Sequence, residues 1–573
     1  MKASLMMIAL LLASCTSLSP KRDVVLLSII GTNDVHGGLD EQTGGLAAFS
    51  GYVHALRSQQ DRVVVLLDGG DMWQGTLESN LNEGAAVMAT YNALGYDAAT
   101  IGNHEFDFGP VGDSAIPMSD RDDPRGALKA RAAEASFPML AANLIDASTQ
   151  EPVDWPNVSP SQMLTKSGVR IGVIGITTAG TLTATISANT IGLLMAPLAS
   201  TVEREAKALR AAGADLVIVA AHAGGSCRAF DDPDDLSSCE ADAEIFELAR
   251  VLPKGLVDQI VAGHHHAGIA HIVNGVAITS NRARLPSFGR VDYVLDKRTH
   301  QILSRQVFPP QPVCRRWQEG SRTCAKGNDP STVAAAYEGI EIKALPAVTA
   351  AMADAIDFAK ARKARRLGVT LETAFTRRGE PDAVIGHMMT DAIREATGAD
   401  VAIHNVAGGI RADFEPGELT FGDVYRVFPF DNLLAVLELN GAELKRLLTH
   451  QVHESGRRAG ISGVRIEVVC ANGTMALSLR KPDGNYVEDD DKLRVAANDF
   501  LLLGGGRIFK PIMPDEGYTI DFSQPRLRDV WVDWFEQRGG ILRESDFHAS
   551  GGSRWALPQD YLTSCPRPDN SSH

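Results

Sequence analysis

Five short polar loops in the first half of the sequence carry side chains that bind metal ions. Each follows an apolar run, and they read Asp34-Val35-His36, Gly70-Asp71, Gly102-Asn103-His104-Glu105, His222 and Gly263-His264-His265-His266. One such loop is usually a turn or a structural histidine, but five in succession favour a shared site. Carboxylate, imidazole and amide donors without thiolates suit Zn, Mn, Fe or Co. The loops therefore predict a two-metal site, because two ions about 3.5–4 Å apart stabilise the attacking and leaving oxygens of phosphoryl transfer.

Local spacing indicates how two of these loops present their ligands. Asp34 and His36 are two residues apart, so in an extended backbone their side chains point to the same side. Gly69 and Gly70 allow a sharp turn that brings Asp71 close to a ligand. We expect Asp71 to bridge both metal ions.

The apolar runs before the loops predict the strands of a layered α/β domain. They occupy residues 24–30, 63–67, 96–101, 216–221 and 257–262, with further strands at 138–144 and 169–176 and helices at 84–94 and 200–211. The polar loops converge if these strands share one sheet edge, because open α/β sheets bind ligands at the carboxyl ends of their strands. At 573 residues the chain is too long for one core, so a second large domain is expected.

The second half of the sequence carries a candidate site for an organic anion. Gly408 and Gly409 lie close to Arg411, and glycines leave room for an anion that a guanidinium binds. Phe430 and Asn432 could stack on a base and bind its edge, although a hairpin with a core phenylalanine is the alternative. Residues 331–366 are rich in Ala, Lys, Arg and Glu, and we expect a mostly helical connection broken at Pro346.

The five loops and their order resemble the calcineurin-like metallophosphoesterases. Thr32-Asn33-Asp34-Val35-His36-Gly37 and Asn103-His104-Glu105-Phe106-Asp107 are similar to the 5′-nucleotidase/UDP-sugar hydrolase branch, and residues 403–432 resemble its C-terminal domain. The resemblance implies an N-terminal four-layer α/β/β/α sandwich at 23–330, a helical linker at 331–366 and a C-terminal α/β substrate-binding domain at 367–565. Residues 1–22 would be a signal peptide with a short tether, and residues 566–573 a tail.

The resemblance also implies roles for individual residues of the first domain. One metal ion would be held by Asp34, His36, Asp71 and His266, and the other by Asp71, Asn103, His222 and His264. His104 would not bind metal; it would stabilise the phosphoryl or leaving group, oriented by Asp107. His266 departs from the branch, which often has Gln at this position.

In the second domain the resemblance implies a nucleotide site. Arg411 with Arg377 or Arg378 would bind the phosphate, while Phe430 and Phe500 would stack on the base and Asn432 would bind its edge. The sequence Gly504-Gly505-Gly506-Arg507 departs from the family, which commonly has an Asp near the ribose where this chain has Gly506.

The N-terminus has the pattern of an export signal. Lys2 precedes the apolar residues 5–12, which are too few to span a bilayer. Leu12-Ala13-Ser14-Cys15 resembles a bacterial lipobox, which would leave Cys15 as an acylated N-terminus. The alternatives are an ordinary cleaved signal or a buried leucine-rich helix. We expect an exported protein anchored through lipid on Cys15, in the outer membrane and facing the periplasm or the surface.

The remaining six cysteines are consistent with export, because an even number outside the cytoplasm predicts disulfides. Short separations pair Cys227 with Cys239 and Cys314 with Cys324, which leaves Cys470 and Cys565. A zinc site is the rival, but no Cys-x-x-Cys spacing occurs.

The formal charge of −16 argues against a nucleic-acid-binding surface, which needs a basic footprint. It leaves small anions possible, because local cations or metal ions bind them. The sequence therefore predicts a nucleotide-hydrolysing enzyme with two divalent metal ions (Zn, Mn or Co). The alternatives are a cyclic-nucleotide phosphodiesterase, a UDP-sugar hydrolase, a thiosulfohydrolase-like enzyme, or a non-catalytic surface lipoprotein that binds nucleotides or host factors.

Overall fold

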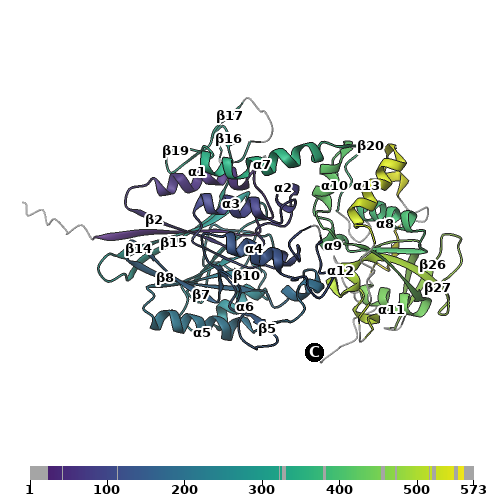
Figure 1. Cartoon of the computed structure of the whole chain (residues 1–573), viewed down its shortest axis with the longest axis horizontal. Helices are drawn as coiled ribbons and strands as arrows, with labels where there is room; N and C mark the ends of the chain where they lie inside the picture. Colours follow the sequence, from purple (N-terminus) through teal and green to yellow (C-terminus); the bar gives the residue numbers. More distant parts are fainter. Residues whose placement is uncertain are drawn as a thin grey trace, which may run out of the picture.

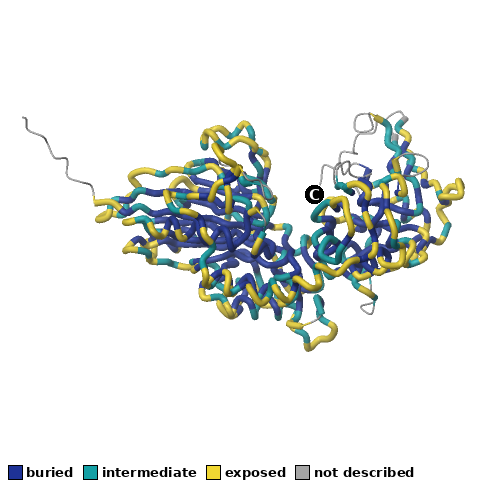
Figure 2. Tube along the Cα trace, turned by 90° about the horizontal axis from the view of Figure 1, so that it is seen from above, coloured by how far each residue is buried: buried dark blue, intermediate teal, exposed yellow. Residues whose placement is uncertain are grey.

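The computed structural model forms two α/β domains connected by a long helix (Figure 1). It describes residues 23–41, 43–112, 114–321, 323–325, 331–377, 383–452, 459–471, 474–514, 517–518, 524–547 and 553–559. Figure 2 shows the two domains as separate bodies, each with a buried interior. Cys15 lies outside the described residues.

Two sheets form the centre of the first domain. The seven-stranded sheet has the order β15-β14-β1-β2-β3-β4-β6, and the six-stranded sheet has the order β12-β13-β11-β10-β8-β7. The bounds in the first are β1 Val24–Thr32, β2 Arg62–Asp68, β3 Ala98–Thr100, β4 Met139–Leu140, β6 Val158–Ser159, β14 Ser287–Asp296 and β15 Ile302–Pro312. Those in the second are β7 Ser161–Lys166, β8 Val169–Thr177, β10 Leu216–His222, β11 Gln259–Ala262, β12 Ile269–Val273 and β13 Val276–Ser280.

Successive side chains of a strand point to opposite faces of the sheet, and this alternation produces the layers. Val65 and Leu67 of β2 pack between the sheets, with Ile218 of β10 opposite them, while Val64 and Leu66 face the helices on the other side. That outer layer consists of α1 Gly45–Arg57, α3 Ala85–Leu94 and α4 Gly126–Glu134. On the opposite face of the molecule, α5 Leu198–Ala211 and α6 Glu244–Val251 cover the six-stranded sheet. The predicted four-layer α/β/β/α sandwich is therefore confirmed.

The five loops do not all follow strands of one sheet. β1, β2 and β3 belong to the seven-stranded sheet, whereas β10 and β11 belong to the six-stranded one. The loops still meet, because the two sheets pack face to face with their loop-bearing ends together. Continuous apolar runs do not reveal this, since a strand buried on both faces looks the same in either sheet.

Helix α7 (Pro346–Lys363) connects the domains. Val348 and Met352 pack into the core of the first domain, and Ala359 contacts Tyr425 of the second. The predicted break at Pro346 is wrong, because proline lacks the N–H that the first helical position does not need and here begins the helix. The residues before it form the short strands β17 Thr332–Ala334, β18 Ala336–Tyr337 and β19 Ile340–Glu341.

The second domain combines small sheets with helices, as predicted. The sheet orders are β22-β20-β28, β23-β27-β21-β24 and β26-β25-β29. Their bounds are β20 Arg366–Leu371, β21 Val401–His404, β22 Gly417–Thr420, β23 Leu434–Asn440, β24 Gly460–Ser462, β25 Arg465–Ala471, β26 Thr474–Arg480, β27 Lys492–Asn498, β28 Gly540–Leu542 and β29 Trp555–Ala556. The main helices are α8 Val384–Thr397, α10 Phe421–Val427, α11 Gly441–Val452 and α13 Leu527–Arg538.

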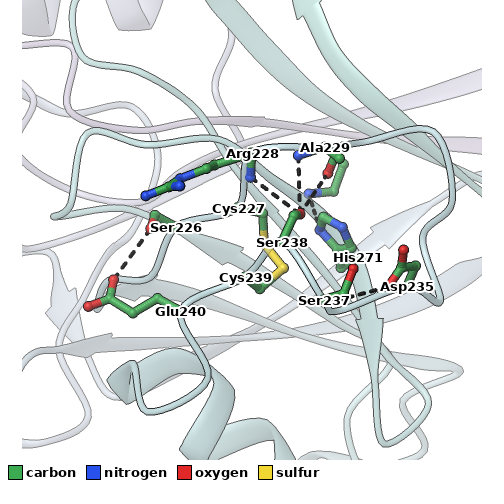
Figure 3. The surroundings of a disulfide bond; sticks show 11 residues. Ser226, Cys227, Arg228, Ala229, Asp235, Ser237, Ser238, Cys239, Glu240 and His271 are labelled. Carbon is green, nitrogen blue, oxygen red and sulfur yellow. Dashed lines mark hydrogen bonds between the residues drawn. A yellow bond between two sulfur atoms is a disulfide. The ribbon is translucent and has the colours of Figure 1, made fainter.

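Both short-range disulfides predicted from the sequence are present. Cys227 is bonded to Cys239, beside His271 (Figure 3), and Cys314 to Cys324. Cys470 is also disulfide-bonded, and its predicted partner Cys565 lies outside the described residues. Among the described residues, no helix combines the length and apolar character needed to cross a membrane.

Candidate active site

The first group of predicted metal ligands lies at the ends of β1, β2 and β11. The ligand atoms of Asp34, His36, Asp71 and His266 all lie within 4.8 Å of one another. Nε2 of His36 is 3.0 Å from Nε2 of His266, which is itself 3.4 Å from Oδ1 of Asp34. Except for the partly exposed His266, these side chains are buried.

A second group lies directly beside the first and shares Asp71. Oδ2 of Asp71 is 3.2 Å from Nε2 of His222, and Nδ1 of His264 is 3.1 Å from the same nitrogen. Oδ1 of Asn103 also lies 3.0 Å from Nε2 of His222. Because Asp71 belongs to both groups, one carboxylate is placed to contact two cations.

Hydrogen bonds to the backbone determine which histidine nitrogens face the centre. Nδ1 of His36 donates to the carbonyl of Gln74 at 2.7 Å, and Nδ1 of His222 donates to that of Gly69 at 2.9 Å. Each ring therefore directs the lone pair of Nε2 inward, as metal-binding histidines do. At such short range these atoms need a proton or a cation between them: burial lowers the pKa of His222, but Asp71 outweighs it and raises the pKa to about 10.

One cation of the chain already occupies the edge of this cluster. Nη2 of Arg411, from the second domain, lies 3.3 Å from Nε2 of His36. Its position shows that a positive group is accommodated among these acceptors. The donor set and its geometry therefore fit two divalent cations, with Asp34, His36, Asp71 and His266 available to one and Asp71, Asn103, His222 and His264 to the other.

The carboxylates of the cluster are ionised despite their burial. Burial raises the pKa of Asp34, but His266 and His222 outweigh it and hold the pKa well below the usual value. Burial likewise opposes ionisation of Asp71, and His222 and His104 hold its pKa well below the usual range. The cluster therefore supplies negative charge to any bound cation.

The backbone of the ligand loops is left-handed, which corrects the expected extended geometry at Asp34 and His36. Their φ angles are 49° and 47°, and those of Asp71, His264 and His266 are 57°, 77° and 52°. Such angles are uncommon outside glycine and cost about 1–3 kcal/mol each where they are strained. The loops hold these ligands by tight turns, not by strand alternation.

Glu105 is a functional candidate that sequence reasoning left without a role. Its buried carboxylate accepts hydrogen bonds from the backbone N–H of Asp71 at 2.9 Å, Met72 at 2.7 Å and Gly102 at 2.6 Å. Burial and the nearby Asp71 raise the pKa of Glu105 to about 8, whereas these N–H groups favour the ionised form. Glu105 therefore connects the loop of Asp71 to the loop of Asn103 by hydrogen bonds. In the sequence, its position next to His104 was the feature that could have indicated a role.

His104 and Asp107 form the predicted pair. Nδ1 of His104 donates to Oδ2 of Asp107 at 2.6 Å, and Thr185 donates to the other carboxylate oxygen at 2.7 Å. Burial lowers the pKa of His104, but the carboxylates of Asp107 and Asp71 outweigh it and raise the pKa overall. The arrangement fixes the ring and leaves its Nε2 as a potential proton donor.

A cavity of about 440 Å³ extends from the metal cluster into the second domain. The predicted residues along its wall are Asp71, Asn103, His104, Asp107, His264, His266, Arg411, Phe430, Asn432 and Phe500. The ring of Phe430 lies 5.8 Å from that of His104, and the guanidinium of Arg411 lies 5.7 Å from the ring of Phe430. The structure thus brings an aromatic ring and a cation from the second domain to the centre in the first.

Other predicted substrate residues have different surroundings. Arg377 donates to Asp413 and to the carbonyl of Ile410, and it is not among the described residues that line the cavity. Arg378 lies outside the described residues. The amide nitrogen of Asn432 donates to Asp499 at 3.0 Å, so only part of its amide remains for a ligand.

Two residues near the cavity connect the domains and were missed from the sequence. The side-chain amides of Gln74 and Asn80 both donate to the carbonyl of Pro429, at 3.2 and 3.0 Å. On the other side of the cavity, Ser187 donates to the carbonyl of Leu503 at 3.0 Å. The sequence pattern does not predict such contacts, because each joins a side chain to a backbone carbonyl that is distant in the sequence.

Two protein families match successive parts of the chain. Residues 27–268 match the calcineurin-like phosphoesterases, and residues 361–513 match the 5′-nucleotidase C-terminal domain. Protein UshA of Yersinia enterocolitica is 26% identical over 511 residues, which cover 84% of this chain and 86% of that protein. The 5′-nucleotidase of Vibrio cholerae is 26% identical over 519 residues, which cover 84% and 85%. A crystal structure of a 5′-nucleotidase precursor from Thermus thermophilus shares the fold, with a TM-score of 0.68, 21% identity and coverage of 90% and 97%.

The first prediction concerns the shared carboxylate. Asp71→Asn should reduce bound metal and turnover together, because it weakens both groups of ligands. Loss of a partner outside the ligand set costs about 10–100-fold in metal affinity, and the loss here should be at least as large. Metal content by mass spectrometry and phosphate release would be measured, with the surface variant Asp123→Asn as control. Two retained metal equivalents with full turnover would contradict the shared role.

A second prediction separates His104 from the metal ligands. His104→Asn should keep its metal content and lose about 10²–10⁴-fold in turnover, the usual effect of removing a proton donor. The loss should be greatest for substrates with poor leaving groups. Metal content and kcat would be compared across esters of different leaving-group pKa. Loss of metal would instead identify His104 as a ligand.

Proposed function

Since the chain belongs to the calcineurin-like phosphoesterases with a 5′-nucleotidase C-terminal domain, we propose that this metal-dependent phosphoester hydrolase releases phosphate from nucleotides. One observation carries the proposal: a single cavity joins the metal-ligand cluster to aromatic side chains of the other domain. The two ends of this cavity therefore suit the two ends of a nucleotide: the ligand cluster suits the phosphate, and the aromatic side chains suit the base.

The phosphate end is proposed to lie beside the ligand cluster. Divalent cations held there supply positive charge that stabilises the attacking and leaving oxygens of phosphoryl transfer. Arg411 reaches the cluster and is placed to bind a phosphate oxygen. His104, fixed by Asp107, is placed to donate a proton to the leaving oxygen. We propose that the cations are Zn, Mn or Co, and metal analysis of the purified protein would identify them.

The base end is proposed to lie between Phe430 and Phe500. Both rings line the cavity, and Phe500 packs against Gly505, where a Cβ would come within 2.4 Å of its ring. Aromatic stacking on a base is worth about 1–3 kcal/mol and accepts any base. We therefore infer a broad base preference.

Ribose selectivity is proposed to be weak. Gly506 lines the cavity and has no carboxylate to accept hydrogen bonds from ribose hydroxyls. A Cβ at this position would meet nothing closer than 3.8 Å, so the space beside the sugar is open. Hydrogen bonds to a charged group contribute about 1.5–3 kcal/mol, and the absence of one should leave AMP and dAMP similar as substrates.

The alternative reactions keep the same ligand cluster and differ in the substrate. A release assay over nucleotides, cyclic nucleotides, nucleotide sugars and a thiosulfate ester, with Mn, Co and Zn, would separate them. A protein that binds metal and nucleotides without turnover would be the non-catalytic lipoprotein. The ligand set argues against that alternative, because every predicted ligand is present and directed at the centre.

Phe430→Ala should lower kcat/KM for AMP and dAMP by about 5–150-fold, which corresponds to the loss of roughly 1–3 kcal/mol of stacking. Hydrolysis of a small phosphate ester without a base should change much less. The control is Tyr486→Ala, an exposed tyrosine outside the catalytic cavity. Equal activity of the unmodified enzyme on AMP and on a simple ester, with a ratio unmoved by Phe430→Ala, would overturn the proposed base site.

We also propose that the protein is exported and anchored through Cys15, as a lipoprotein of the outer membrane that faces the periplasm or the surface. The residues before Cys15 support this proposal, and several acyl chains anchor a protein stably where one binds only marginally. Cys15→Ser should accumulate as uncleaved precursor or as soluble protein. Membrane fractionation and intact mass would be measured, and an unchanged mass and membrane fraction would rule out the anchor.

A further inference from the structure

A second cavity, of about 840 Å³, lies where α7 meets both domains. We call it the junction groove. Its described wall consists of Leu77, Asn80, Leu81, Glu83, Phe108, Gly112 and Ala115 from the first domain, Phe358, Arg362 and Arg365 from α7 and its end, and Phe421, Tyr425, Asp431, Arg526, Arg528 and Asp529 from the second. It is larger than the catalytic cavity and lined by both arginines and aromatic rings.

The arginines of the groove differ in how far their charges are neutralised. Arg528 is buried and ion-paired with Asp431, and Arg365 pairs with Glu536 at 2.5 Å. Arg362 is exposed and has no carboxylate partner among the described residues. Of the remaining acids in the wall, Glu83 accepts from the N–H of Gly112, and Asp529 is exposed. Arg362 therefore presents to the groove a positive charge that no carboxylate of the described residues neutralises.

Aromatic rings lie beside these charges. Phe358 is 61% exposed, and the guanidinium of Arg362 lies 5.3 Å from its ring. Across the groove, Phe421 and Tyr425 are in contact at 6.0 Å, and Arg528 lies over Tyr425 at 4.4 Å. One exposed phenylalanine needs no explanation. Phe358, however, borders a cavity and lies beside Arg362, which has no carboxylate partner among the described residues. Its ring is a surface for stacking, next to a guanidinium that can bind an anion.

We infer that the junction groove is a second binding site, separate from the catalytic cavity, for a small molecule that carries both an aromatic ring and a phosphate. Arg362 would bind the phosphate, and Phe358 would stack on the ring. Nucleotides belong to this chemical class. The groove contains none of the metal-ligand residues, so bound ligand would not be hydrolysed there.

The two cavities share part of their walls. Asn80, Phe108 and Asp431 line both, and Nη1 of Arg528, in the groove, donates to the carbonyl of Phe430 at 2.9 Å. A ligand in the groove would therefore contact residues that hold the base-stacking ring of the catalytic cavity. This link gives the groove a physical route to influence substrate binding.

Equilibrium dialysis with the methylenephosphonate analogue of AMP, which cannot be hydrolysed, would test the inference on the full chain. The metal-loaded protein should bind two equivalents at saturation, and the double variant Phe358→Ala/Arg362→Glu should bind one fewer. Arg250→Glu, a charge reversal at an exposed arginine of α6 outside both cavities, should bind as many as the unmodified protein.

Equal binding by the unmodified protein and the double variant would overturn the inference, as would an equal loss in Arg250→Glu. The readout is the difference between proteins, so it does not depend on the proposed catalytic function. If nucleotides do not bind at the catalytic cavity, both counts fall by one and their difference remains. The two proposals therefore fail in distinguishable ways.

Discussion

The close packing of buried histidine nitrogens and carboxylate oxygens is the constraint on which the active site depends. Nitrogen and oxygen atoms from several loops approach one another to 3.0–3.4 Å, and all of these side chains except the partly exposed His266 are buried. Such an arrangement persists only when the surrounding structure holds it and positive charge relieves it. The two-sheet core, the backbone carbonyls behind the histidines and the carboxylate of Glu105 provide the first condition.

The second condition links the two domains. Arg411 brings a guanidinium to Nε2 of His36, so the second domain contributes charge to the centre as well as a wall to the cavity. The same domain also contributes Phe430, which follows α10 and lies beside His104. The Arg411 guanidinium and the rings of His104 and Phe430 thereby lie within one small volume, although these residues come from distant parts of the sequence.

Much of this arrangement could be predicted from the sequence, because each ligand directly follows a strand with a clear apolar pattern. The same runs predicted a layered α/β domain, the family resemblance predicted its four layers, and short cysteine spacing predicted the local disulfides. Which strand belongs to which of the two sheets could not be predicted, since Leu216–His222 and Arg62–Asp68 are both apolar runs that are buried over most of their length. The left-handed turns at Asp34 and His36, the side-chain amides that contact Pro429 and the pairing of Arg377 with Asp413 depend on tertiary contacts that no local rule encodes.

The division of the catalytic cavity between two domains has a thermodynamic consequence. The hydrogen bonds that cross it include two to the carbonyl of Pro429 and one to that of Leu503. An observed dissociation constant equals the intrinsic one divided by the fraction of molecules whose domains are arranged for binding. Substrate and inter-domain contacts therefore stabilise one another reciprocally. Affinity in this protein is a property of the whole chain, and substitutions at the inter-domain contacts can tune it without touching the substrate.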